Sequence, residues 1–101
     1  MKNITVEELK NRLDAGEQLF IIDVREPAEY AEYNIGGKLL PLGQILGMQL
    51  ESLEDLKNEE IIVHCKMGGR SMQACVVLEQ VGFTNVTNLV GGMNAWKQKY
   101  G

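Results

Sequence analysis

The most informative segment of the sequence reads Ile61-Ile62-Val63-His64-Cys65-Lys66-Met67-Gly68-Gly69-Arg70-Ser71. It opens with a short, largely apolar run, typical of a strand that is buried on both faces of a parallel sheet. After the two glycines, Ser71 is expected to cap a helix whose apolar side chains recur at helical spacing until Gly82. A strand therefore delivers Cys65 to a tight loop, and the loop leads directly into a helix.

This order of elements has a chemical consequence for the cysteine. The first turn of a helix leaves backbone N–H groups without partners and carries the positive end of the helix dipole. Gly68 and Gly69 allow the loop to curl with its N–H groups pointing inward, which makes an anion cradle. A thiol at its centre is expected to have a pKa below the ordinary value of about 8.5. Lys66 and Arg70 add positive charge at the rim.

The loop from Cys65 to Ser71 resembles the active-site loop of the rhodanese family of sulfurtransferases. Two further segments resemble motifs of that family in the expected order: Ile22-Asp23-Val24-Arg25-Glu26-Pro27 with Glu29-Tyr30, and Leu89-Val90-Gly91-Gly92-Met93-Asn94-Ala95-Trp96. The chain departs from the family at Tyr33-Asn34-Ile35, where relatives commonly carry Gly-His-Ile. That change concerns loop packing more than chemistry, because the usual His is not a catalytic base in the family.

The resemblance implies a rhodanese-like fold and a catalytic Cys65 that carries sulfur as a persulfide. It also implies substrate binding by the rest of the loop: Lys66, Met67, Gly68, Gly69, Arg70 and Ser71. Cysteine-dependent phosphatases share this architecture but leave one residue more between the Cys and the Arg. A phosphoryl group needs donors for three oxygens and so a wider cradle than the single outer sulfur of a persulfide. The shorter loop favours sulfur transfer.

The remaining elements are expected to alternate between helices and strands. Helices are predicted from the capping box at Thr5 to Gly16, from Pro27 to Tyr33, across the apolar positions from Ile45 to Leu53, and around Trp96. Strands are predicted at 19–24, 38–42 and 85–89, besides 61–64. We therefore expect one domain over residues 1–101, with an α/β fold and a mainly parallel central sheet of about five strands flanked by helices on both faces.

Asp23 and Arg25 follow the second predicted strand and are expected near Cys65, because ligands bind beyond the carboxyl ends of parallel strands. They are possible supporting residues of the site. The structural interpretation is favoured, since an Asp and an Arg at a strand end more often fix a loop through hydrogen bonds than contact substrate.

Structural roles are also preferred for the other reactive side chains. Cys75 sits at an apolar helical position and is read as an inert buried thiol. His64 is read as a strand residue whose imidazole is hydrogen-bonded. A zinc site is not expected, because the chain has one His and two Cys, and His64 and Cys65 point to opposite faces of a strand. No metal or organic cofactor is called for by the chemistry.

Composition limits the class of protein. The 101 residues are 45% hydrophobic and carry a net charge of −4, which argues against nucleic-acid or anionic-membrane binding. No apolar run approaches a membrane span or a signal peptide, so a cytoplasmic location is expected, with both cysteines reduced.

The predicted reaction moves a sulfane sulfur from a donor such as thiosulfate, through Cys65, to a thiophilic acceptor such as cyanide or a thiol. The basic loop favours thiosulfate. Thioredoxin or a sulfur-relay protein stays open as a partner. One alternative is a persulfide carrier that receives sulfur from a partner protein for cofactor or tRNA thiolation. A weaker alternative is a Cys-based phosphatase or arsenate reductase.

Overall fold

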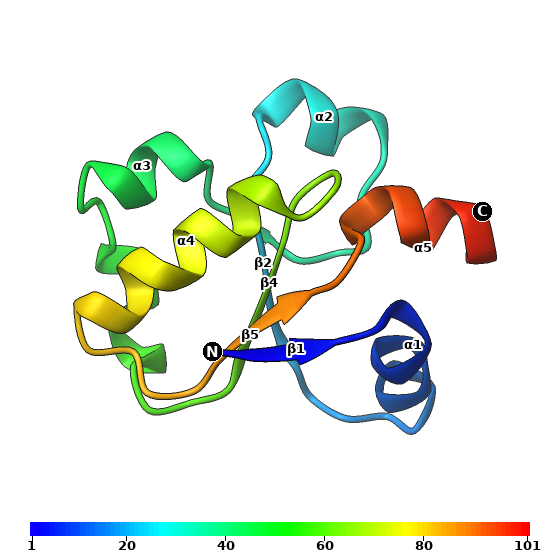
Figure 1. Cartoon of the computed structure of the whole chain (residues 1–101), viewed down its shortest axis with the longest axis horizontal. Helices are drawn as coiled ribbons and strands as arrows, with labels where there is room; N and C mark the ends of the chain where they lie inside the picture. The colour runs from blue at the N-terminus through cyan, green and yellow to red at the C-terminus, as the bar shows by residue number, and fades with distance from the viewer.

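Five parallel strands form the central sheet of the computed structural model, which describes residues 1–101. They are β1 (Lys2–Ile4), β2 (Phe20–Asp23), β3 (Lys38–Leu39), β4 (Ile61–His64) and β5 (Val86–Leu89). Their order across the sheet is β1-β5-β4-β2-β3, and every neighbouring pair is parallel. The predicted α/β fold is confirmed, with β4 at the centre of the sheet (Figure 1).

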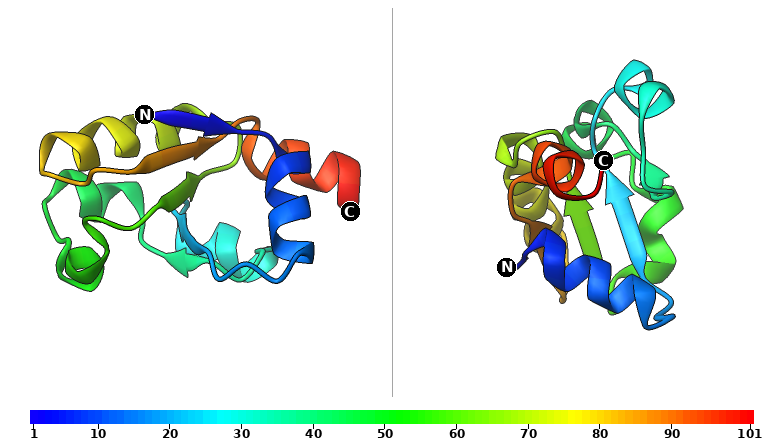
Figure 2. Two further views of the ribbon diagram at one scale, coloured as in Figure 1. Left: turned by 90° about the horizontal axis from the view of Figure 1, so that it is seen from below. Right: turned by 90° about the vertical axis from the view of Figure 1, so that its right-hand side faces the viewer.

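Helices cover both faces of this sheet, as the two views of Figure 2 show. They are α1 (Val6–Asp14), α2 (Pro27–Glu32), α3 (Leu42–Leu46), the 3₁₀ helix η1 (Glu51–Leu56), α4 (Gly69–Gln80) and α5 (Gly92–Tyr100). One apolar cluster joins α3, η1 and α4 to the sheet, and a second joins α1 and α5 to the opposite face. The two clusters arise because successive strand residues alternate: Ile61 and Val63 belong to the first, and Ile62 to the second.

Individual side chains cap α1, anchor α5 and close the turn after α2. Thr5 caps α1 and forms a reciprocal capping box with Glu8, as the sequence predicts. Trp96 anchors α5 in the second cluster and is 7% exposed. Asn34, at the position where relatives commonly carry His, closes the turn after α2 by bonding to Tyr30 O and Gly36 N.

One strand was missed by the sequence predictions, and two predictions about the helices are wrong. The strand β1 was not anticipated, because it has only three residues and is defined by its pairing with β5. The helix expected across Ile45 to Leu53 is two short helices, α3 and η1, separated where Met48 adopts a positive φ of 59°. Ser71 lies inside α4 and does not cap it, because the cap residue is Gly68 at φ 125°.

The short helix α2 contributes no buried residue and lies beside the β4–α4 loop, above the carboxyl ends of the strands in Figure 1. Its position brings Glu29 against that loop. None of the helices has the length and apolar character needed to cross a membrane.

Candidate active site

Cys65 follows the last residue of β4 and sits at the base of the loop that leads into α4. Its Sγ accepts hydrogen bonds from the N–H groups of Gly68 at 3.0 Å and Ser71 at 3.3 Å. The Ser71 hydroxyl lies 3.5 Å from the same sulfur. Gly68 reaches this geometry through its φ of 125°, which residues with a Cβ rarely adopt. The loop therefore surrounds the sulfur with hydrogen-bond donors, as the cradle predicted from the sequence requires.

The start of α5 holds the carbonyl groups of this loop away from the sulfur. The N–H groups of Met93 and Asn94 donate to the carbonyl oxygens of Cys65 and Lys66, each at 2.9 Å. This contact requires glycine at position 92, because a Cβ there would overlap Cys65 O and lie 2.8 Å from Lys66 O. The Gly-Gly pair before α5 therefore fixes which backbone groups of the loop face Cys65.

Hydrogen bonding overrides burial in setting the ionisation of Cys65. The residue is 1% exposed, and burial by itself opposes the thiolate. The hydroxyl and N–H groups of Ser71 and the N–H groups of Gly68 and Met67 favour the thiolate more strongly, so the pKa of the Cys65 thiol lies below its ordinary value. The site holds a thiol that is prepared for nucleophilic attack.

Ser71 is the residue whose contribution sequence reasoning underestimated. It is fully buried, and its hydroxyl is 2.6 Å from Asn88 Oδ1 and 3.0 Å from Gly68 O, besides its contact with Cys65. The sequence predicts Asn88, near the carboxyl end of β5, only as a strand residue. The sequence could have revealed this orientation. Asn88 is two residues after the buried Val86 on the same strand, so both side chains point to the same face, toward α4.

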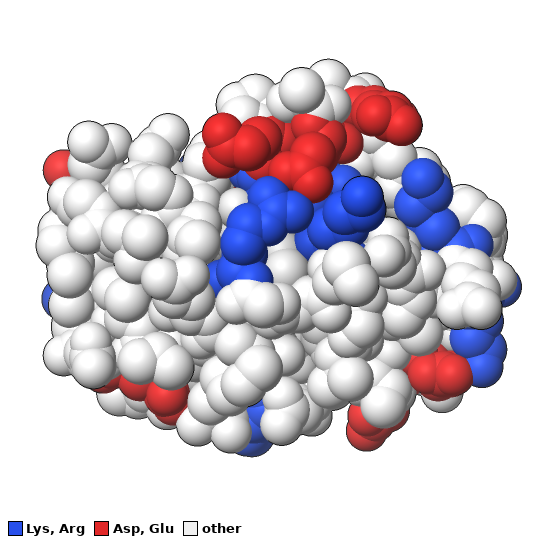
Figure 3. Space-filling model, turned by 45° about the horizontal axis from the view of Figure 1, so that its top comes forward, with Lys and Arg blue, Asp and Glu red and all other residues white.

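The positive charge expected at the rim is partly neutralised. Arg70 makes a two-pronged ion pair with Glu29, with Nη–Oε distances of 2.7 and 2.9 Å. The guanidinium holds the pKa of Glu29 at about 2, against the opposing effect of burial. Figure 3 shows the result, with acidic atoms over α2 in direct contact with basic atoms below them. Lys66 is exposed and makes no ion pair, so it carries the free positive charge of the loop.

Asp23 and Arg25 form a buried ion pair at the end of β2. Arg25 donates to both carboxylate oxygens of Asp23, the shortest distance being 2.8 Å, and to the carbonyl oxygen of Tyr33 at 2.7 Å. These bonds tie the end of β2 to the turn after α2. The geometry favours the structural interpretation, in which the pair fixes the segment that carries Glu29.

His64 differs from its expected environment. The imidazole is fully buried on the face opposite Cys65, and neither ring nitrogen has a hydrogen-bond partner. The carboxylate of Asp23 stays 3.7 Å from Nε2 because Arg25 engages it. Burial lowers the pKa of His64, and the Asp23 charge opposes this only in part. The expectation of a hydrogen-bonded imidazole is wrong, and His64 is a neutral core residue at pH 7.

Cys75 is a buried residue of α4 that belongs to the same apolar cluster as Cys65. Burial raises the pKa of its thiol to about 12. The residue is therefore protonated at physiological pH, and it has the character of a small apolar side chain.

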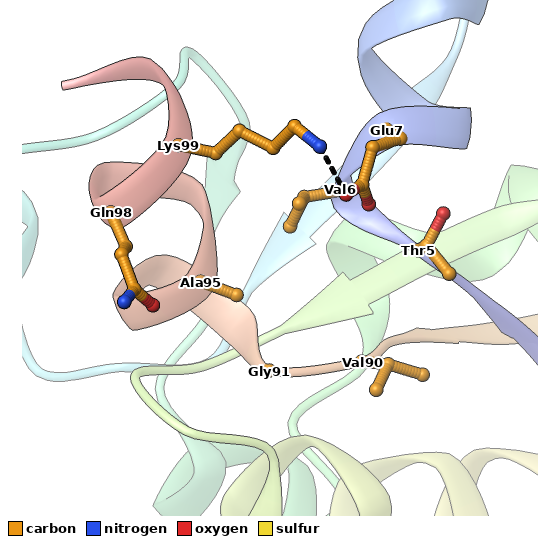
Figure 4. A pocket seen from close by; sticks show the side chains of 8 residues that line it. All are labelled: Thr5, Val6, Glu7, Val90, Gly91, Ala95, Gln98 and Lys99. Atoms are coloured by element: carbon orange, nitrogen blue, oxygen red, sulfur yellow. Dashed lines mark hydrogen bonds and ion pairs between the residues drawn. The ribbon is translucent and has the colours of Figure 1, made fainter.

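None of the hollows of the surface is lined by a cysteine or a histidine. The largest, of about 490 Å³, lies between the start of α1 and α5 and is lined by none of the residues 65–71 (Figure 4). Lys99 and Glu7 form an ion pair across it. No group of three or more His, Cys, Asp or Glu side chains is placed to hold a metal ion. The β4–α4 loop is accordingly the candidate active site.

Comparisons with known proteins agree with this fold. Residues 5–99 match the family model of the rhodanese-like domain. A sulfurtransferase of Allochromatium vinosum is 37% identical over 95% of this chain and 88% of its own length. The putative sulfurtransferase YtwF of Bacillus subtilis is 39% identical over 96% of this chain and 91% of its own length. A crystal structure of a rhodanese-like domain protein from Staphylococcus aureus superimposes with a TM-score of 0.83, at 38% identity over 95% of this chain and 91% of that one.

The chain belongs to the rhodanese-like domain family. Relatives of this kind support sulfur transfer as its general activity.

Proposed function

We propose that this protein transfers a sulfane sulfur from thiosulfate to cyanide or a low-molecular-weight thiol through a persulfide on Cys65. The observation that carries the proposal is the set of donors on Cys65 Sγ, with Gly68 N at 3.0 Å, Ser71 N at 3.3 Å and the Ser71 hydroxyl at 3.5 Å. Such a set stabilises a sulfur anion, either the thiolate or the outer sulfur of a persulfide.

The reaction has two half-steps, each a displacement at sulfur. The Cys65 thiolate attacks the outer sulfur of thiosulfate; a sulfur–sulfur bond forms to Cys65, and the bond to the sulfonate sulfur breaks with release of sulfite. Cyanide or a thiolate then attacks the outer sulfur of the persulfide and regenerates the Cys65 thiolate. Because the donor product leaves before the acceptor reacts, ping-pong kinetics are expected.

Access to Cys65 favours this chemistry over phosphate-ester hydrolysis. The cysteine is 1% exposed, so a slender terminal sulfur reaches it more readily than a phosphoryl group with three equatorial oxygens. The Arg70 guanidinium is engaged by Glu29, whereas phosphoryl transfer would need that fork for the phosphate oxygens. In sulfur transfer, the free cation beside the departing sulfite is Lys66.

The proposal is tested by intact-mass spectrometry of wild type and Cys65→Ser after incubation with thiosulfate. Wild type is expected to gain one sulfur atom and to lose it to cyanide as thiocyanate. Cys75→Ser serves as the matched control and is expected to load like wild type. Loading of the Cys65→Ser protein would contradict the assignment of the site.

A second function, transfer of sulfur to or from a partner protein, is favoured by the surface beside the loop. Residues 39–50 and 71–78 contain no charged side chain. Their exposed apolar side chains lie on α4 and at the end of α3 and just after it; they are Leu46, Met48, Met72 and Val76. Met67, in the loop before α4, is 69% exposed. Protein interfaces are depleted in charge at their centres and enriched in Met. One relative, 37% identical over 95% of this chain, is the putative sulfur carrier protein YrkF of Bacillus subtilis; the chain spans 51% of its length.

The two functions differ in the donor that loads Cys65 fastest. A carrier is expected to accept sulfur rapidly from a persulfidated protein and slowly from thiosulfate. Met72→Glu places a charge on this surface away from Cys65, so it is expected to slow loading from the protein donor and to leave loading from thiosulfate unchanged.

A further inference from the structure

Ser71 has one hydroxyl proton and three neighbours that compete for it. Asn88 Oδ1 lies at 2.6 Å and Gly68 O at 3.0 Å, and both can only accept. Cys65 Sγ, at 3.5 Å, donates to the hydroxyl as a thiol but needs a donated proton as a thiolate. The Ser71 O–H bond can therefore point at Asn88 or Gly68 when Cys65 is a thiol and at the sulfur when Cys65 is a thiolate.

Asn88 is placed to control that direction. It is 4% exposed, and its only side-chain hydrogen bond is the one between Oδ1 and the Ser71 hydroxyl. A half-turn of the amide about its last side-chain bond exchanges Oδ1 for Nδ2 in nearly the same place. Because Nδ2 has no protein partner, this turn breaks no second hydrogen bond. The amide can thus accept from Ser71 in one state and donate to it in the other.

We propose that Asn88 is a positioning residue whose amide turns over when Cys65 ionises, so that the Ser71 hydroxyl points at Asn88 in the thiol state and at the sulfur in the thiolate and persulfide states. The inference rests on the proposed role of Cys65 as the residue that carries sulfur.

The proton balance of this step is simple. In the thiol state, S–H donates to Ser71 Oγ and Ser71 O–H donates to Asn88 Oδ1. On ionisation the thiol proton leaves to water, and the hydroxyl proton stays on Ser71 and rotates toward the sulfur. Asn88 Nδ2 then donates to Ser71 Oγ, which strengthens the hydroxyl as a donor, because linked hydrogen bonds polarise one another.

The measurement is the pH titration of the Cys65 thiolate by its ultraviolet absorbance, with the Cys65→Ser protein subtracted at each pH. The test variant is Asn88→Leu, which has a similar volume but neither donates nor accepts. Its titration midpoint is expected to rise by roughly half to one pH unit, as for a weakened hydrogen bond to a charged group. In the Ser71→Ala background, the same substitution is expected to leave the midpoint unchanged, because the hydroxyl that couples Asn88 to Cys65 is gone.

Three results would overturn the proposal. An equal rise in both backgrounds would mean that Asn88 acts on Cys65 without Ser71. An unchanged midpoint in the protein that retains Ser71 would mean that the amide of Asn88 does not affect the thiolate. A lower midpoint would mean that the amide only competes for the hydroxyl proton and never turns over.

Two further variants serve as a control and as a replacement for Asn88→Leu. Thr87→Val, on the opposite face of β5 where Thr87 donates to Glu60, removes a partly buried hydrogen bond from the same strand and is expected to leave the midpoint unchanged. If Asn88→Leu does not fold, the smaller Asn88→Ala, which also neither donates nor accepts, gives the same comparison. A rise that shrinks in the Ser71→Ala background supports the proposal, and an equal rise contradicts it.

The titration needs no sulfur donor, so its result can be told apart from the result of the loading experiment. If wild type fails to load sulfur from any donor while the midpoints shift as expected, the role of Asn88 stands and the assignment of sulfur transfer to Cys65 fails. If loading succeeds but the midpoints do not depend on Ser71, the role of Asn88 fails alone.

Discussion

The two cysteines of this protein are equally buried and chemically opposite. Cys65 is 1% exposed and Cys75 is 0% exposed, and both belong to the same apolar cluster. Burial raises the pKa of Cys75 to about 12, whereas the pKa of Cys65 lies below its ordinary value. Burial thus disfavours the thiolate form of both cysteines. Only Cys65 has hydrogen-bond donors around its sulfur, and these donors outweigh the effect of burial on its pKa.

The donors exist because of where each cysteine lies in its element. Cys75 is inside α4, where backbone N–H groups bond to carbonyls of the preceding turn. Cys65 lies just ahead of that helix, where the N–H groups of the first turn have no partners within it. Ten residues along the chain separate a thiol whose pKa is lowered from a thiol whose pKa is raised.

The largest expected effect comes from removing each cysteine in turn. Cys65→Ser is expected to lower the rate of sulfur transfer at least about a thousandfold, as for loss of a covalent nucleophile. Cys75→Ser is expected to keep at least roughly half of the wild-type rate, since its thiol stays protonated at neutral pH. Steady-state assays with thiosulfate and cyanide measure both. Comparable losses in the two variants would break the contrast between them.

The next largest effect tests whether the backbone N–H groups of the loop account for the different reactivity expected of Cys65 and Cys75. Gly92→Ala is expected to lower kcat/KM about tenfold or more and to destabilise the fold by about 2–4 kcal/mol, because the new Cβ displaces the carbonyls of Cys65 and Lys66. Gly16→Ala is the matched control: Gly16 also has a positive φ, of 83°, but a Cβ there meets nothing within 4 Å. Kinetics and thermal unfolding of both variants separate two effects: the destabilisation caused by a Cβ at a residue with positive φ, and the displacement of the loop.

A smaller effect is expected from the positive charge of Arg70, which would add to the effect of the hydrogen bonds on Cys65. Glu29→Gln frees the Arg70 guanidinium and is expected to raise kcat/KM for thiosulfate, a dianion, by about threefold at low salt. The gain should fade as ionic strength rises. Glu32→Gln, on the same helix but outside any ion pair, is expected to change nothing. A gain of the same size in both variants would mean that net charge, and not the release of Arg70, is responsible.

The smallest effect concerns His64, a buried titratable residue whose ring nitrogens have no hydrogen-bond partner. Its pKa in the folded state is lowered, so its contribution to stability is complete above the unfolded value of about 6.5 and is lost as pH falls below it. His64→Leu is expected to raise the melting temperature by a few degrees more at pH 5.5 than at pH 8. An equal change at both pH values would show that His64 does not titrate with unfolding.

Local sequence patterns predicted the elements that have strong internal signals. The apolar runs of β2, β4 and β5, the capping box of α1 and the Gly-Gly turn before α5 all lie where the sequence placed them. The sequence did not reveal β1, whose three residues form a strand only by pairing with β5. It also did not reveal the break after α3, because a positive φ at Met48 has no local signal.

For the candidate site, the sequence by itself predicted the candidate cysteine and the loop that surrounds its sulfur. A cysteine between a buried strand and a Gly-Gly helix start brings unpartnered N–H groups to its own sulfur, because the elements that create them are contiguous in the chain. Tertiary structure decided everything that depends on distant residues. The ion pair of Arg70 with Glu29, the α5 N–H groups that hold the loop carbonyls, and the contact of Ser71 with Asn88 join segments that meet only when the sheet assembles. Periodicity and caps encode local geometry, whereas partners across the fold are chosen by strand order and register, which no single segment contains.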